Sequence, residues 1–173
     1  MHRFMLLGVA AIALALAGCG GDDGDDNGSG GTGGDGACTD LQNTAPQITE
    51  VDLPQDPPTP MGLVGITALQ DGVYFFAADT VFTGVGGGSG PTEVTHKSTW
   101  RITGNNIEIA NKDATRGDET GKGTFTISGD ELSFTFDCPA GRPGGTVKFT
   151  ASAGTIQIFD DDGNNVDTYA LQP

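Results

Sequence analysis

The residue types that most often carry out catalysis are sparse in this sequence, and they do not cluster. His96 is one of two histidines, and it lies beside Lys97 after a glycine-rich loop at residues 86–91. A histidine acts as a general base only when a nucleophile or an orienting carboxylate lies beside it, and the sequence alone assigns none. Ser89 lies between glycines but lacks the G-x-S-x-G pattern of hydrolase nucleophiles. We therefore predict a surface histidine, no catalytic residues and no enzyme activity.

Acidic and amide side chains gather at residues 160–167, where oxygen ligands for calcium could converge. The segment supplies four aspartates and two asparagines. Its register departs from the usual calcium loop, because Ile158 occupies the place of the first ligand. A second acidic run, residues 22–27, lacks the spacing and the closing glutamate of such a loop. We interpret these segments as a hairpin loop and a spacer, with calcium binding as the alternative, and we predict no resident metal or cofactor.

The beginning of the chain carries the pattern of an export signal. A short basic start is followed by an apolar run of 13 residues, 4–16, and then by Ala17, Gly18 and Cys19. The run is shorter than the roughly 20 residues of a transmembrane helix. This segment resembles the signal peptide and lipobox of bacterial lipoproteins. The resemblance implies cleavage after residue 18 and a diacylglycerol thioether on Cys19, with a membrane-spanning helix as the alternative.

The lipoprotein resemblance also implies a location. Two or more acyl chains hold a protein stably at a membrane, because each buried methylene contributes about 0.8 kcal/mol. Gly20, rather than aspartate, follows Cys19, and in enteric lipoproteins this is compatible with sorting to the outer membrane. We therefore expect a cell-envelope protein of a Gram-negative bacterium, anchored in the outer membrane through the lipid on Cys19.

Residues 19–37 are predicted to be a disordered tether, and residues 38–60 an extended segment. Residues 20–36 include five aspartates and no apolar side chain, so they cannot bury a core. Residues 38–60 contain five prolines, which disfavour a helix. The chain has 23 acidic and 8 basic residues, and loss of Arg3 with the leader leaves a net charge near −16. Such a chain repels phosphate backbones, and we expect no nucleic-acid partner.

Residues 61–173 show the pattern of one all-β domain. Short apolar runs alternate with polar residues at period two, as in half-buried antiparallel strands. Hairpins are expected at residues 99–109, 124–138 and 147–159, a last strand at 166–171, and further strands within 62–69 and 73–82. About eight strands without helical crossovers favour an up-and-down meander that closes into a barrel, with a β-sandwich as the alternative.

Residues 100–109, 125–136 and 149–159 repeat one unit: aromatic-x-apolar, a glycine-containing turn, and apolar-x-apolar. In this repeat the chain resembles the lipocalin-like domains of bacterial lipoproteins. The resemblance implies a barrel that binds a small hydrophobic ligand. The inward aromatic residues that could line its cavity are Trp100, Phe125, Phe134 and Phe149. The alternative is a solid core, because inward aromatic residues usually fill a barrel of this size.

Two cysteines remain once Cys19 is lipidated, namely Cys38 and Cys138. Disulfides persist outside the cytoplasm, so we predict that these two cysteines pair. Zinc ligation is the weaker alternative, because no histidines cluster with them.

Two functions remain open at this point. The barrel is either an interaction or surface module that contacts other envelope proteins, or a lipocalin-like binder of a small hydrophobic ligand. An apolar cavity of about 300 Å³ or more would favour ligand binding. A close-packed interior would favour the interaction module.

Overall fold

The computed structural model describes residues 38–84, 90, 95–113 and 117–173. The predicted leader, Cys19, the tether and Ser89 lie outside the described residues. All described residues belong to one compact unit, Gly34–Pro173. Within that part of the chain no helix is long and apolar enough to cross a membrane.

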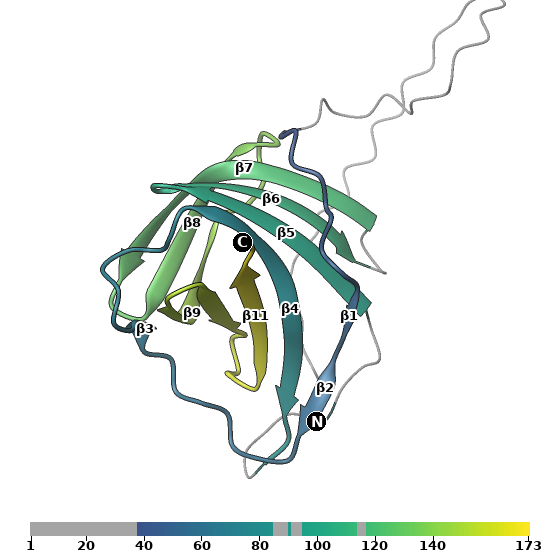
Figure 1. The fold of residues 1–173 in the computed structure, drawn as a ribbon, viewed down its shortest axis with the longest axis vertical. Helices are drawn as coiled ribbons and strands as arrows, with labels where there is room; N and C mark the ends of the chain where they lie inside the picture. Colours follow the sequence, from purple (N-terminus) through teal and green to yellow (C-terminus); the bar gives the residue numbers. More distant parts are fainter. Residues whose placement is uncertain (1–37, 85–89, 91–94, 114–116) are drawn as a thin grey trace, which may run out of the picture. The chain divides into compact units, whose positions relative to one another are not determined.

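Eight antiparallel strands form a closed barrel (Figure 1). They are β4 (Gly72–Phe82), β5 (Thr95–Thr103), β6 (Asn106–Asp113), β7 (Gly117–Ser128), β8 (Glu131–Cys138), β9 (Gly145–Ser152), β10 (Thr155–Phe159) and β11 (Asn165–Leu171). Strands β5 to β11 pair in sequence order, and β4 pairs with both β11 and β5, which closes the barrel. The predicted all-β, up-and-down, lipocalin-like barrel is therefore confirmed, and the β-sandwich alternative is wrong.

Tight glycine turns join the strands at one end of the barrel. Gly104, Gly129 and Gly154 have φ angles of 57°, 61° and 74°, which glycine adopts without a steric penalty. Each lies between the strands of one predicted hairpin, so β5–β6, β7–β8 and β9–β10 pair as expected. We call this end of the barrel the turn end.

The N-terminal part of the described chain adds three short strands, β1 (Ile48–Thr49), β2 (Val51–Leu53) and β3 (Gly62–Leu63). Strands β4 and β5 pair only over Gly72–Phe75 and Thr99–Ile102. Beyond that stretch, β1 pairs with β5 and β2 pairs with β4, and Figure 1 shows both alongside the barrel strands. We call this place, where residues 48–53 fill the gap between β4 and β5, the seam. Strand β3 pairs with β9.

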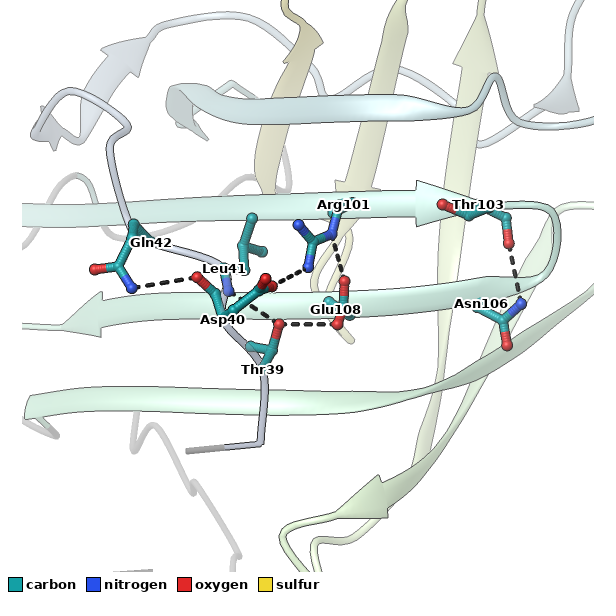
Figure 2. Close-up of polar contacts among 8 residues, drawn as sticks. All are labelled: Thr39, Asp40, Leu41, Gln42, Arg101, Thr103, Asn106 and Glu108. Carbon is teal, nitrogen blue, oxygen red and sulfur yellow. Dashed lines mark hydrogen bonds and ion pairs between the residues drawn. The ribbon is translucent and has the colours of Figure 1, made fainter. Parts of the chain in front are cut away.

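Residues 38–47, the N-terminal strap, lie against β5 and β6. Figure 2 shows Arg101 of β5 in ion pairs with Asp40 of the strap and with Glu108 of β6. The Thr39 hydroxyl donates to Glu108 Oε1 at 2.9 Å. The Arg101 guanidinium holds the pKa of Glu108 below its usual value. The Glu108 carboxylate is therefore held by both Thr39 and Arg101.

Interior side chains from all eight barrel strands form the main core. Its buried members are Leu69, Tyr74, Phe76, Trp100, Ile102, Ile107, Ile109, Phe125, Leu132, Phe149, Ala151, Ile156 and Tyr169. Leu132 and Phe149 are 0% exposed. The alternation of apolar and polar residues along each strand therefore places one apolar face of every strand inside the barrel.

Candidate functional site

The four predicted cavity residues pack into the core. The Trp100 ring stacks on Tyr169 with a centroid separation of 4.0 Å and meets the edge of Phe134 at 5.9 Å. Phe125 and Phe149 are buried members of the same core, and Phe134 is partly buried against it. These contacts occupy the middle of the barrel interior, where an apolar ligand of a lipocalin would lie.

Described residues line hollows at two margins of the barrel. One, of about 330 Å³, lies at the turn end and is lined by Leu63, Thr67, Ala68, Leu69, Gly104, Asn105, Phe125 and Ile127. Of the predicted cavity residues, only Phe125 borders it. The other, of about 310 Å³, lies beside the seam and is lined by Ala45, Gln47, Thr95, His96, Lys97 and Lys112. The first hollow is at the lower limit of the usual ligand pocket, about 300 Å³.

A polar cluster lies inside the barrel at the seam, away from the turn end. Glu50, Asp79 and His96 each bring one possible ligand atom to within 4.8 Å of the others. We call these three residues the seam cluster. Glu50 lies between β1 and β2, Asp79 lies on β4 and His96 lies on β5. Three elements therefore meet where β4 and β5 no longer pair.

A register shift in β4 turns Asp79 toward the interior. Phe76 pairs with Tyr169, whereas Ala78 pairs with Thr168, so Ala77 is the extra residue of a bulge. Without the bulge, Asp79 would lie on the face opposite Phe76 and point outward. With it, Asp79 lies directly across from Asp167 of β11, and opposed side chains share a face.

Asp79 is almost fully enclosed. It is 2% exposed, and its Oδ2 lies 3.7 Å from His96 Nε2. The Asn165 side chain lies close enough to the Asp79 carboxylate to lower its pKa. Asp79 Oδ1 and Asn165 Oδ1 are nevertheless buried without a hydrogen-bond partner among the described residues. Such orphaned acceptors are costly, and each needs an explanation.

His96 is half-buried and faces Asp79, while 30% of its side chain remains exposed. Its ring meets Phe76 edge-on at a centroid distance of 6.3 Å. Ser98 and Trp100 follow His96 on the same strand face, because the strand period is two. The surrounding Thr95–Ser98 segment is polar on both faces. Its alternation therefore could not indicate which side chains point inward.

Negative charge is concentrated at this part of the interior. Burial raises the pKa of Asp79, Glu50 raises it further, and His96 and Asn165 oppose the shift. Burial also raises the pKa of Asp167 to about 7, with further contributions from Asp79, Asp160 and Glu50. Close carboxylates disfavour one another's ionised form. The site therefore favours a bound proton or another cation.

The Asp167→Asn variant is expected to change how stability depends on pH in buffers free of divalent cations. The folded-state pKa near 7 lies above the unfolded value of about 3.9, so the folded state holds an extra proton between these values. The stabilisation is fully present below pH 4 and is lost as the pH rises through 7. Urea unfolding at pH 8 should show Asp167→Asn to be more stable than the parent by on the order of 1–2 kcal/mol.

The control for this prediction is Asp118→Asn, because the Asp118 side chain is 74% exposed and pairs only with Lys112 among the described residues. In this variant the change in the free energy of unfolding between pH 4 and pH 8 should be close to that of the parent. A parent and an Asp167→Asn variant that lose stability equally over this range would refute the elevated pKa.

The acidic loop after β10 is a hydrogen-bonded turn. Asp160 Oδ1 accepts a hydrogen bond from the Asn165 backbone N at 3.1 Å, and the Asp160 carbonyl accepts one from Gly163 N at 3.0 Å. Asp167 lies within β11 on the interior face. The hairpin interpretation is confirmed, and the carboxylates of residues 160–167 do not form one set.

The Cys38–Cys138 disulfide forms in the structure, with Cα atoms 5.4 Å apart. This agrees with the pairing predicted from the sequence. It joins the beginning of the N-terminal strap to the end of β8. The sequence patterns did not indicate Glu50 or Asp79, because one lies in the proline-rich segment and the other is turned inward by a bulge.

Comparison with known proteins adds no functional assignment. No protein-family model matches the chain, and neither a curated protein nor a solved structure matches it significantly.

Proposed function

We propose that this chain is a lipid-anchored cell-envelope protein whose barrel is an interaction or surface module. The lipobox-like segment ending at Cys19 supports the anchor. The Cys38–Cys138 disulfide supports an oxidising compartment, because disulfides rarely persist in the cytosol. The acidic tether between them would hold the barrel away from the lipid headgroups.

The observation that carries the interaction module is the packed aromatic core within the barrel. Trp100, Phe149 and Tyr169 are buried members of one continuous core. A lipocalin-like carrier needs that volume for its ligand, whereas an interaction module needs only its outer surface. Contacts with other envelope proteins would therefore be made by outward-facing side chains.

Exposed apolar side chains occur on residues 51–64, and those of β2 give this surface a location. Val51 and Met61 are 56% and 63% exposed, and Leu53 and Val64 are also exposed. Four prolines lie in the same stretch. An extended apolar and proline-rich segment on a rigid barrel suits contact with another protein.

Hydrophobic-ligand binding remains the second proposal because of the hollow of about 330 Å³ at the turn end. Its apolar lining includes Leu63, Leu69 and Phe125. A fluorescent naphthalene probe tests this directly. Saturable binding that is weakened by Leu69→Gln would support the carrier, and no binding would leave the interaction module as the proposed function.

Mutation of Cys19 is expected to abolish membrane attachment. Cells expressing the full chain would be fed an alkyne fatty acid, and the labelled protein would be followed by gel and by membrane fractionation. The parent should be labelled and sediment with membranes, whereas Cys19→Ser should be unlabelled, because the thioether cannot form. A Cys19→Ser protein that keeps its label would place the lipid elsewhere and refute the proposed anchor.

Site-specific photo-crosslinking in living cells tests the interaction surface. A photoreactive residue at Val51, which pairs with Thr80 of β4 away from the turn end, should give one discrete crosslinked partner, identified by mass spectrometry and lost when competing unlabelled barrel is coexpressed. The same residue at Glu131, which is exposed near the turn end, is the positional control. Equal products from Glu131, or none from Val51, would argue against this surface.

A further inference from the structure

We propose that the seam cluster, Glu50, Asp79 and His96, is a binding site for one divalent first-row transition-metal cation, with Zn²⁺ as the matching probe. This proposal goes beyond the envelope function, because an interaction module needs no metal. It is independent of the lipid anchor.

The ligand atoms of the three side chains are spaced almost as they would be around a bound zinc ion. Their ligand atoms lie within 4.8 Å of one another, and His96 Nε2 and Asp79 Oδ2 are 3.7 Å apart. Zinc bonds to nitrogen and oxygen are about 2.0–2.2 Å long, so two ligands of a tetrahedral ion lie roughly 3.4 Å apart. The pair on β4 and β5 needs only a small approach, and Glu50 lies within side-chain reach.

Two buried oxygens at the cluster, on Asp79 and Asn165, accept no hydrogen bond among the described residues. Asp79 Oδ1 belongs to a side chain that is only 3% exposed, yet it has no hydrogen-bond partner among the described residues. Asn165 Oδ1, on a side chain beside Asp79, is also buried without a hydrogen-bond partner among the described residues. A cation, or water bound to it, would satisfy acceptors that otherwise remain desolvated.

The donor set selects the class of metal. Imidazole nitrogen suits zinc and its first-row neighbours, whereas calcium and magnesium prefer oxygen ligands alone. Two carboxylates would neutralise the charge of a divalent ion, and Asp167 faces Asp79 with a further carboxyl group. Three protein ligands also leave a coordination position for water.

The origin of the ligands gives metal binding a structural consequence. Glu50 comes from the link between β1 and β2, whereas Asp79 and His96 come from β4 and β5 beyond the point where those strands pair. One ion would therefore connect the two sides of the seam through the N-terminal segment. Metal binding should slow hydrogen exchange in residues 48–53 more than in the turn-end hairpins.

The test uses the full chain, purified in detergent and stripped of metal with a chelator. Calorimetry with Zn²⁺ should show one site per chain, and saturating zinc should raise the Tm by at least about 5 °C. Mg²⁺ and Ca²⁺ at equal concentration should bind at least about tenfold more weakly. Elemental analysis of protein purified without chelator provides a second readout of occupancy.

Three variants assign the ligands. Glu50→Gln and His96→Gln should each weaken zinc binding at least about tenfold and remove the thermal shift. Asp79→Asn should lose zinc binding while the metal-free protein remains folded, because the change removes a buried charge that Glu50 opposes. Circular dichroism of the metal-free variants separates loss of the site from loss of the fold.

The matched control is Glu131→Gln, whose carboxylate is 49% exposed and pairs with Lys148 near the turn end. It should bind zinc as the parent does. A parent without a saturable site would overturn the proposal. So would zinc binding that is unchanged in both Glu50→Gln and His96→Gln, because the ion would then lie on other carboxylates, such as Asp160–Asp162.

Discussion

Phe149→Ala is expected to lower the free energy of unfolding by about 3–5 kcal/mol. Phe149 is 0% exposed, and it lies on the interior face of β9 opposite Ile158 of β10. Removing the ring deletes buried apolar surface and leaves a void that a closed barrel cannot readily collapse. Urea unfolding monitored by the fluorescence of Trp100 measures the change.

Phe75→Ala is the matched control for this substitution. Phe75 lies between two buried interior residues of β4, Tyr74 and Phe76, and is itself only partly buried. We expect a loss of about 1 kcal/mol, because less apolar surface leaves water. The void in Phe149→Ala should also admit a small apolar probe that the parent excludes. Similar losses for the two variants would contradict a close-packed interior.

The barrel could be predicted because each hairpin carries its own signal. In β8, Leu132 and Phe134 alternate with polar residues, and Gly129 marks the turn before them. Such local patterns determine strand, face and turn together. The continuous chain of hairpins then left closure as the simplest way to protect the sheet edges.

Strands β1 and β2 could not be predicted in the same way. Residues 48–53 have no alternation that separates an inner from an outer face, and Val51 and Leu53 are exposed. These residues become strands because β4 and β5 diverge and leave unpaired backbone groups beside them. This pairing depends on the closed barrel, so no local sequence pattern indicates that residues 48–53 form strands.

The seam cluster could not be predicted from the sequence for a related reason. Strict alternation from Phe76 would direct Asp79 outward, and only the extra residue Ala77 reverses it. Bulges of this kind redirect a side chain without a distinctive sequence signal. Glu50 reaches the cluster only through the seam. The disulfide could be predicted because only two cysteines remain after lipidation and the protein is expected to be exported from the cytoplasm.

Loss of the Cys38–Cys138 disulfide is expected to lower the free energy of unfolding by about 2–4 kcal/mol. The bond closes a loop of 100 residues, for which the chain-entropy model gives an upper value of about 4.7 kcal/mol. Urea unfolding of the parent with and without a reductant measures the loss. The double variant Cys38→Ser, Cys138→Ser should unfold at the midpoint of the reduced parent and should not respond to the reductant.

Hydrogen exchange in the N-terminal strap distinguishes two explanations of this loss of stability. Without the disulfide, only the contacts of residues 39–47 with β5 and β6 hold the strap, chiefly the Asp40–Arg101–Glu108 ion pairs and the bond from Ala45 N to Thr99 Oγ1. Exposed ion pairs contribute at most about 1 kcal/mol each. If the bond mainly restrains the unfolded chain, hydrogen exchange in the strap of the folded double variant should change little. Rapid exchange confined to residues 38–47, with no change in the unfolding midpoint, would instead show that the bond fastens the strap and adds nothing to the barrel.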